Sequence, residues 1–150
     1  MTQNVDRETV VSRLLAADDI LILCHKNPDG DTIGSGTALC LALQQLGKNA
    51  AVLCSDPIPA MYDYMPITVF DGSFRPAFVV AVDVAGIHLF GERSNIQEYA
   101  EHVDRCIDHH GLFLVSRQGR AHLACAGARL CAALAPPARC SGHLQHGGCT

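Results

Sequence analysis

Four short apolar runs, each ending in or followed by an acidic residue or a histidine, limit the folds that this sequence can adopt. They lie at residues 20–24, 49–56, 77–83 and 103–110. Runs this short and this apolar are typical of strands buried on both faces of a parallel sheet. Helical patterns separate them, so the sequence predicts an α/β fold in which helices flank a parallel sheet.

The shorter elements follow from apolar spacing. In residues 6–17, Val10, Leu14 and Leu15 share one face of a predicted amphipathic helix. The other expected elements are a short helix at 57–65, a weak strand at 67–70, a helix at 91–103 and helical potential at 121–135.

The longest expected helix begins at Asp31 or the residue after it and runs to about Leu46. Asp31 can serve as its N-cap, and Gly47 is typical of a C-terminal stop. Gly34 and Gly36 lack side chains, so we expect this helix to lie close to a neighbouring backbone. Its apolar stripe comprises Ile33, Leu39, Leu43 and Leu46.

Polar side chains gather where the predicted strands end. His25, Asp56, Asp83 and Asp108 each lie at or just past such an end. Ligand sites of parallel α/β sheets lie beyond the carboxyl ends of the strands. We therefore expect one rim of the sheet to carry the functional residues.

The sharpest motif is His25-x-x-x-Asp29-x-Asp31, which falls on a tight loop containing Pro28 and Gly30. One imidazole and two carboxylates suit a hard to borderline divalent ion such as Mn²⁺ or Mg²⁺. The alternative is an ordinary turn in which Asp31 only caps the following helix.

Two further strand ends extend the pattern. Asp83 closes the run at 77–83, and Asp108-His109-His110 closes the last run. Alone, Asp83 also fits a solvated loop or a helix cap. Gathered on one rim, these groups are enough for two ions that activate a water and clamp phosphate oxygens.

These segments resemble three motifs of the DHH phosphoesterase superfamily, in order: HKNPDGDTIGSGTALCLALQQLG, AVD and CIDHH. The resemblance covers about residues 6–110 and is greatest to the bacterial nanoRNase/pAp phosphatase branch. RecJ-type exonucleases, family II pyrophosphatases and some exopolyphosphatases share the superfamily site. The resemblance implies two Mn²⁺ ions, with Mg²⁺ as the alternative.

The resemblance also implies a role for each motif residue. Asp83 would bridge the two ions, Asp108 would support His109, and His110 would contact the scissile phosphate, which makes Asp108 and His110 the expected catalytic residues. The implied metal ligands are His25, Asp29, Asp31, Asp83 and His109.

The expected function is hydrolysis of pAp-like nucleotides or short oligoribonucleotides. The alternatives are hydrolysis of inorganic pyrophosphate or polyphosphate, and a non-catalytic nucleotide- or metal-binding domain. No Asp follows Asp108, whereas the family uses a fourth-motif Asp and a C-terminal DHHA1 domain that binds substrate. We therefore expect weak or absent activity from this chain.

The composition changes abruptly after His110. Residues 1–110 hold all fifteen carboxylates and seven Lys or Arg residues, whereas residues 111–150 hold four Arg and neither acids nor Lys. We therefore expect a partial DHH domain at 1–110 and an atypical tail at 111–150. One hypothesis for this change is a reading-frame shift in the coding DNA just after codon 110, and another is a disordered tail. A third hypothesis is that the chain is a non-functional product of a disrupted gene.

The tail offers one further alternative, a zinc site. The spacing of its cysteines and histidines matches none of the short paired zinc patterns. The residues concerned are Cys125, Cys131, Cys140, Cys149, His122, His143 and His146.

We expect the protein to be cytoplasmic. Hydrophobic residues make up 49% and charged residues 17%, and no apolar run approaches the roughly 20 residues of a membrane span. The N-terminus lacks the pattern of a signal peptide. We expect small nucleotides or short single-stranded oligonucleotides as partners, no membrane, and leave a homodimer open. Small buried thiols in a reducing compartment are expected at Cys24, Cys40, Cys54 and Cys106.

Overall fold

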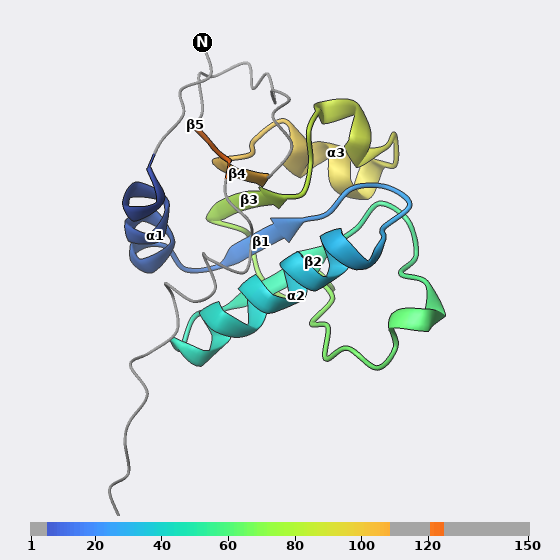
Figure 1. Cartoon of the computed structure of the whole chain (residues 1–150), viewed down its shortest axis with the longest axis horizontal. Helices are drawn as coiled ribbons and strands as arrows, with labels where there is room; N and C mark the ends of the chain where they lie inside the picture. The colour runs from blue at the N-terminus through green and yellow to red at the C-terminus, as the bar shows by residue number, and fades with distance from the viewer. Residues whose placement is uncertain (1–5, 109–120, 125–150) are drawn as a thin grey trace, which may run out of the picture.

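The computed structural model, which describes residues 6–108 and 121–124, confirms the α/β fold with a parallel sheet flanked by helices (Figure 1). The five strands are β1 (Ile20–Leu23), β2 (Ala50–Leu53), β3 (Phe78–Val82), β4 (Arg105–Asp108) and β5 (Ala121–Ala124). Each pairs in parallel with its neighbours in the order β2-β1-β3-β4-β5.

Helices cover both faces of this sheet. The α-helices are α1 (Arg7–Ala16), α2 (Gly30–Gln45) and α3 (Ser94–Ala100), and the 3₁₀ helices are η1 (Ala60–Tyr62) and η2 (Ile87–Phe90). Helices α1 and α2 supply side chains to the core on one face, and η2 and α3 supply the core on the other (Figure 1).

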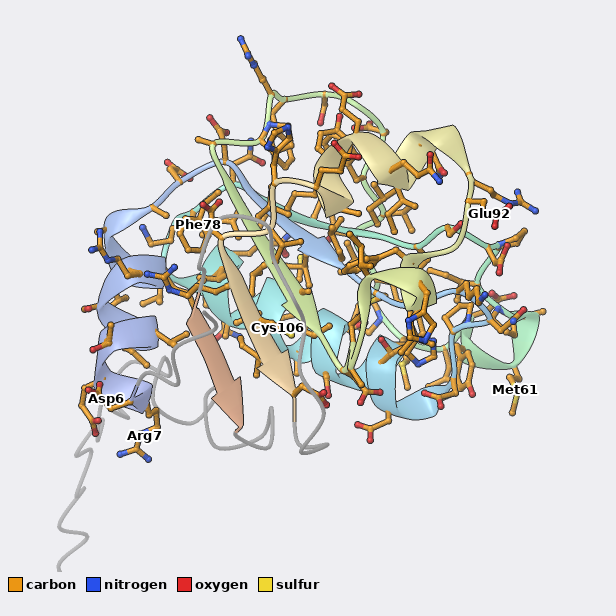
Figure 2. All side chains as sticks on the ribbon, turned by 90° about the horizontal axis from the view of Figure 1, so that it is seen from above. Asp6, Arg7, Met61, Phe78, Glu92 and Cys106 are labelled. Carbon is orange, nitrogen blue, oxygen red and sulfur yellow. The ribbon has the colours of Figure 1, made fainter. Side chains whose placement is uncertain are left out.

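Strand β1 shows why the runs are continuously apolar. Ile20 and Ile22 join the core under α1 and α2, whereas Leu21 and Leu23 join the core under α3. All four side chains are fully buried. Because successive strand residues face opposite sides, a strand covered on both faces needs apolar residues at every position. Figure 2 shows the side chains that fill these layers, with Cys106 on β4 and Met61 projecting from the edge.

The strand order reverses between β1 and β3. From β1 the chain passes through α2 to β2 on one side, then returns to β3 on the other side of β1. Such a reversal leaves a crevice at the carboxyl ends of the two central strands, where open α/β sheets bind ligands. His25 and Asp83 follow these two strands.

Helix α2 begins at Gly30, one residue before the earliest expected start, Asp31. Asp29, not Asp31, is the N-cap, and its Oδ1 accepts the N–H groups of Asp31 (3.0 Å) and Thr32 (3.1 Å). The extended backbone of Asp29 (φ −103°, ψ −175°) places its carboxylate over these amides. The expected stop is confirmed: Gly47 has φ of 77°, and its N–H donates to Gln44 C=O at 2.9 Å.

Two other expectations about helices are wrong. Val10 and Leu14 of α1 are buried, but Leu15 is 47% exposed, because each residue turns a helix by about 100°. Residues 121–124, expected to be helical, form β5 beside β4. Pairing with the open edge of β4 outweighs the helical preference of alanine there; residues 125–135 lie outside the described part.

The weaker expectations hold in shortened form. The helix expected at 57–65 is the single turn η1, and the helix expected at 91–103 is the shorter α3. In place of a strand at 67–70 there is one parallel bridge between Val69 and Val52.

The four expected thiols are free and buried, and burial raises the pKa of Cys40 to about 11. Within the described ranges, no helix is long and apolar enough to cross a membrane.

Only one of the two glycines early in α2 permits a close approach. A Cβ at Gly36 would lie 2.9 Å from Cys24 Sγ, at the end of β1. A Cβ at Gly34 would have no heavy atom within 4 Å. The expected proximity of helix and strand is therefore confirmed at Gly36 and wrong at Gly34.

We predict that Gly34→Ala and Gly36→Ala shift stability in opposite directions. Gly34→Ala should raise the free energy of unfolding by about 0.5–1 kcal/mol through helix propensity. Gly36→Ala should lower it, because overpacking typically costs about 1–3 kcal/mol. Urea denaturation followed by circular dichroism measures both, and equal stability of the two variants would contradict the close packing of α2 on β1.

Candidate metal centre

His25 is held in the tautomer that leaves Nε2 free to bind a metal. It follows β1, and its Nδ1 lies 2.7 Å from the carbonyl oxygen of Lys26. A carbonyl oxygen only accepts hydrogen bonds, so Nδ1–H is the donor. In the neutral ring Nε2 then carries a lone pair, an arrangement common among metal-binding histidines.

Two carboxylates face this Nε2 atom. Asp29 Oδ1 lies 3.7 Å away and Asp83 Oδ2 lies 3.8 Å away. One ligand atom from each of the three residues lies within 4.8 Å of the others. The side chain of Asp83 is only 7% exposed and that of Asp29 is 63% exposed, so the group spans from the protein interior to its surface.

The backbone of Asp83 is unusual. Its φ is 54°, in the left-handed region that residues other than glycine rarely adopt, although Asp and Asn tolerate it best. Its N–H donates to Ile107 C=O at 2.9 Å. This conformation turns the chain sharply at the end of β3 and is held by the neighbouring strand, as backbone strain at functional sites commonly is.

The start of α2 is tied to the end of β3. The fully buried Thr32 contacts the carbonyl oxygen of Val82 through its hydroxyl, at 3.4 Å. Its N–H is one of the two that Asp29 accepts. Thr32 therefore couples the position of Asp29 to that of Asp83, the residue after Val82.

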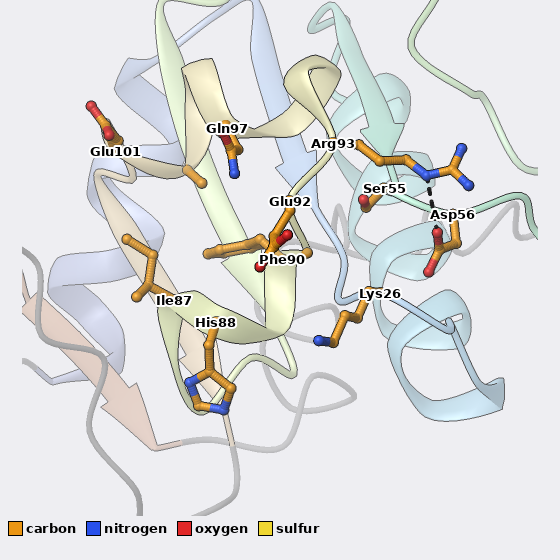
Figure 3. Close-up of a pocket in the computed structure, with 12 residues that line it drawn as sticks. Lys26, Ser55, Asp56, Ile87, His88, Phe90, Glu92, Arg93, Gln97 and Glu101 are labelled. Atoms are coloured by element: carbon orange, nitrogen blue, oxygen red, sulfur yellow. Dashed lines mark ion pairs between the residues drawn. The ribbon is translucent and has the colours of Figure 1, made fainter.

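A carboxylate outside the predicted ligand set holds the His25 loop in place. Asp56 Oδ2 accepts the N–H of Asn27 at 2.9 Å, and Asn27 has a left-handed φ of 49°. Asp56 Oδ1 lies 3.3 Å from Arg93 Nε (Figure 3). The sequence placed Asp56 on the rim without a role and gave no indication of Arg93, because contacts across such separations leave no local pattern.

Those of the other predicted site residues that the structure describes do not belong to the group of three around His25 Nε2. Asp31 is exposed, contacts Ser35 Oγ at 3.4 Å, and is not a member of the three-residue group. Asp108 is buried at the end of β4. His109 and His110 lie outside the described residues, so their metal and phosphate contacts stay predictions.

The carboxyl edge of the sheet carries concentrated negative charge. Burial raises the pKa of the Cys106 thiol, and the carboxylates of Asp108 and Asp83 raise it further. Both carboxylates therefore act on the same buried group. A bound cation would reverse the local sign of the potential, which an acidic protein needs in order to hold a phosphate.

The donor set fits a divalent cation. It offers an imidazole nitrogen with its lone pair exposed and carboxylate oxygens from two loops. Oxygen ligands with one imidazole suit Mn²⁺ or Mg²⁺, whereas thiolates, which favour softer ions, are not part of this group.

Comparison with known families agrees with this geometry. The model of the DHH family, N-terminal domain, matches residues 19–128, which include β1, all five strand ends and the three clustered residues. The chain belongs to the DHH family. Members of this family are metal-dependent phosphoesterases. The match crosses the expected boundary at residue 110, and that boundary stays a prediction.

A solved structure shares the fold of this DHH domain. It is the crystal structure of an exopolyphosphatase-related protein from Bacteroides fragilis, with a TM-score of 0.64 and 20% sequence identity. The match covers 85% of this chain and 42% of that protein, so the chain spans less than half of its length. At this identity the likeness concerns the fold.

We predict that two substitutions of Asp29 separate metal binding from helix capping. Asp29→Asn keeps an oxygen for the cap but removes the charge, whereas Asp29→Ala removes both. Both should weaken Mn²⁺ binding, measured by electron paramagnetic resonance of free Mn²⁺. Only Asp29→Ala should also lower metal-free stability, by about 0.5–2 kcal/mol. Unchanged Mn²⁺ affinity in both variants would exclude Asp29 as a ligand.

We predict that Asp56 supports metal binding without contacting the metal. Asp56→Ala frees the Asn27 N–H and should weaken Mn²⁺ binding by about 10-fold or more, as loss of such supporting groups does in other sites. Asp56→Asn can still accept from Asn27 and should bind nearly as the wild type. Arg93→Gln is the matched control, because it removes only an exposed ion pair. If Asp56→Ala and wild type bind Mn²⁺ equally, the loop does not depend on this carboxylate.

Proposed function

We propose that this chain is a manganese-dependent phosphoesterase domain acting on pAp-like nucleotides or very short oligoribonucleotides. The observation that carries the proposal is His25 Nε2 facing the carboxylates of Asp29 and Asp83 at the point where the strand order reverses. The choice of substrate is supported by the resemblance of the first motif to the nanoRNase/pAp phosphatase branch.

Each residue of the site has a distinct part in this proposal. His25, Asp29 and Asp83 would hold one cation, and Asp31 and His109 would complete a second site with Asp83. Divalent ions held there would neutralise phosphate charge and activate water for attack. Asp83 is held rigidly by its backbone bond to Ile107, which preserves the spacing of the ligands. Asp108 would support His109, and His110 would contact the scissile phosphate.

Two other functions stay in competition. Hydrolysis of pyrophosphate or polyphosphate is favoured by the structural match to an exopolyphosphatase-related protein. A non-catalytic nucleotide- or metal-binding domain is favoured by the lack of Asp and Glu among residues 109–150. Fewer carboxylate ligands lower the affinity for divalent ions, so we propose that turnover by the chain is weak.

The proposal predicts Mn²⁺-dependent hydrolysis that Asp83→Asn abolishes. Asn tolerates the left-handed backbone at this position, so the variant should fold while losing the charge. With Mn²⁺, the wild type should release phosphate from pAp or cleave a dinucleotide faster than it hydrolyses pyrophosphate. We expect Asp83→Asn to lose about 100-fold or more of this rate, the order of effect of one strong transition-state contact.

The outcomes separate the three functions. Preference for pyrophosphate or polyphosphate would favour the second. Tight Mn²⁺ binding with no turnover of any substrate would favour a binding domain. Equal rates in wild type and Asp83→Asn would contradict the proposed site, because the activity would then come from elsewhere or from a contaminant.

A further inference from the structure

A cavity lies beside the candidate metal centre. It has a volume of about 710 Å³, opens to solvent, and is lined by the loops after β1 and β2, the segment around η2, and α3 (Figure 3). Its lining combines charged side chains with uncharged polar groups, and the residues used below are Lys26, Ser55, Asp56, Glu92, Gln97 and Glu101.

The backbone joins this cavity to the metal centre. Lys26 directly follows His25, and its N–H donates to Leu89 C=O at 2.7 Å. The lining at Gly91 is packed tightly against two of these loops: Gly91 has φ of 80°, and a Cβ there would lie 2.9 Å from Ser55 Oγ and 3.4 Å from Lys26 Cβ. The loops after β1, β2 and β3 are therefore held against each other, and the cavity is preformed.

Among the described residues that line the cavity, Lys26 is the strong cation that forms no ion pair. Arg93, the other strong cation, is paired with Asp56 at 3.3 Å. Lys26 is exposed, and within the described residues no carboxylate lies within ion-pair distance of its ammonium group. Figure 3 shows its side chain extending from the loop toward the segment that carries His88.

The rest of the lining disfavours a long polyanion. Asp56, Glu92 and Glu101 outnumber Lys26 and Arg93, so a chain of phosphates would meet net repulsion. One phosphate next to Lys26 would avoid this repulsion. Ser55 and Gln97 offer uncharged hydrogen-bonding groups, which suit hydroxyl and amide-like groups on the remainder of a ligand.

We propose that this cavity is a second subsite of the DHH domain, binding the non-reacting end of the substrate. Its ligand is a single phosphate group carried on an uncharged polar body such as a nucleoside, and the Lys26 ammonium is the phosphate contact. The link to hydrolysis rests on the function proposed above, whereas binding in the cavity is a property that can be measured alone.

The test is equilibrium binding to the full chain in EDTA, where the metal centre contributes no cation. Isothermal titration calorimetry would compare adenosine 3′,5′-bisphosphate, adenosine and inorganic tripolyphosphate. Lys26→Met should raise the Kd for the bisphosphate about 10-fold or more, the worth of one charge-assisted hydrogen bond. It should leave adenosine binding unchanged, and Lys26→Arg should restore most of the affinity.

Two controls sharpen the result. Lys48→Met removes the other lysine of the sequence, which lies at the opposite edge of the sheet and donates to Ala17 C=O; it should bind the bisphosphate as the wild type does. Replacing Glu92 and Glu101 together with Gln should raise the affinity for tripolyphosphate several-fold, because it removes two like charges.

Three results would overturn the subsite: no binding of the bisphosphate by the wild type, equal binding by Lys26→Met, or tighter binding of tripolyphosphate than of the bisphosphate. Failure of the proposed function is distinguishable. Lys26-dependent binding without any hydrolysis in Mn²⁺ would retain the subsite and reject the phosphoesterase. Hydrolysis in Mn²⁺ with Lys26-independent binding would retain the phosphoesterase and reject the subsite.

Discussion

The parallel pairing of β1 with β3 brings the residues of the candidate site together. It places the residues after these two strands at the same edge of the sheet, so that His25 Nε2 and Asp83 Oδ2 come within 3.8 Å although 58 positions separate them in the sequence. The pairing itself depends on a sheet with both faces covered, because all four residues of β1 are apolar and fully buried. Core packing and metal chemistry thus meet at one strand end.

Around that pairing, each loop is fixed by contacts from a neighbour. Thr32 ties the start of α2 to β3, Asp56 holds the backbone of Asn27, and Lys26 is bonded to the segment before Gly91. These contacts limit the movement of the ligands. Preorganised ligands bind a cation without the cost of ordering flexible loops. The same contacts shape the cavity that Lys26 lines and keep it next to the candidate metal centre.

Much of the fold, and the gathering of His25, Asp29 and Asp83 at one edge of the sheet, were predictable from the sequence. Buried parallel strands leave continuous apolar runs, and a site at their carboxyl ends leaves acids and histidines directly after them, as at His25 and Asp83. The choice of Asp29 over Asp31 as N-cap was not predictable, because either acid can precede a helix here. Arg93 and β5 were missed for a related reason: an ion pair to Asp56 and an edge pairing with β4 are long-range contacts, and no local residue pattern records them.

We propose that His25, Asp29 and Asp83 together bind a divalent cation. Crystals of the chain grown with Mn²⁺ and measured at the manganese absorption edge would locate any bound ion. We expect an anomalous peak in contact with His25 Nε2 and with a carboxylate oxygen of each Asp. A well-ordered site without such a peak at saturating Mn²⁺, or a peak bound only by other residues, would contradict it.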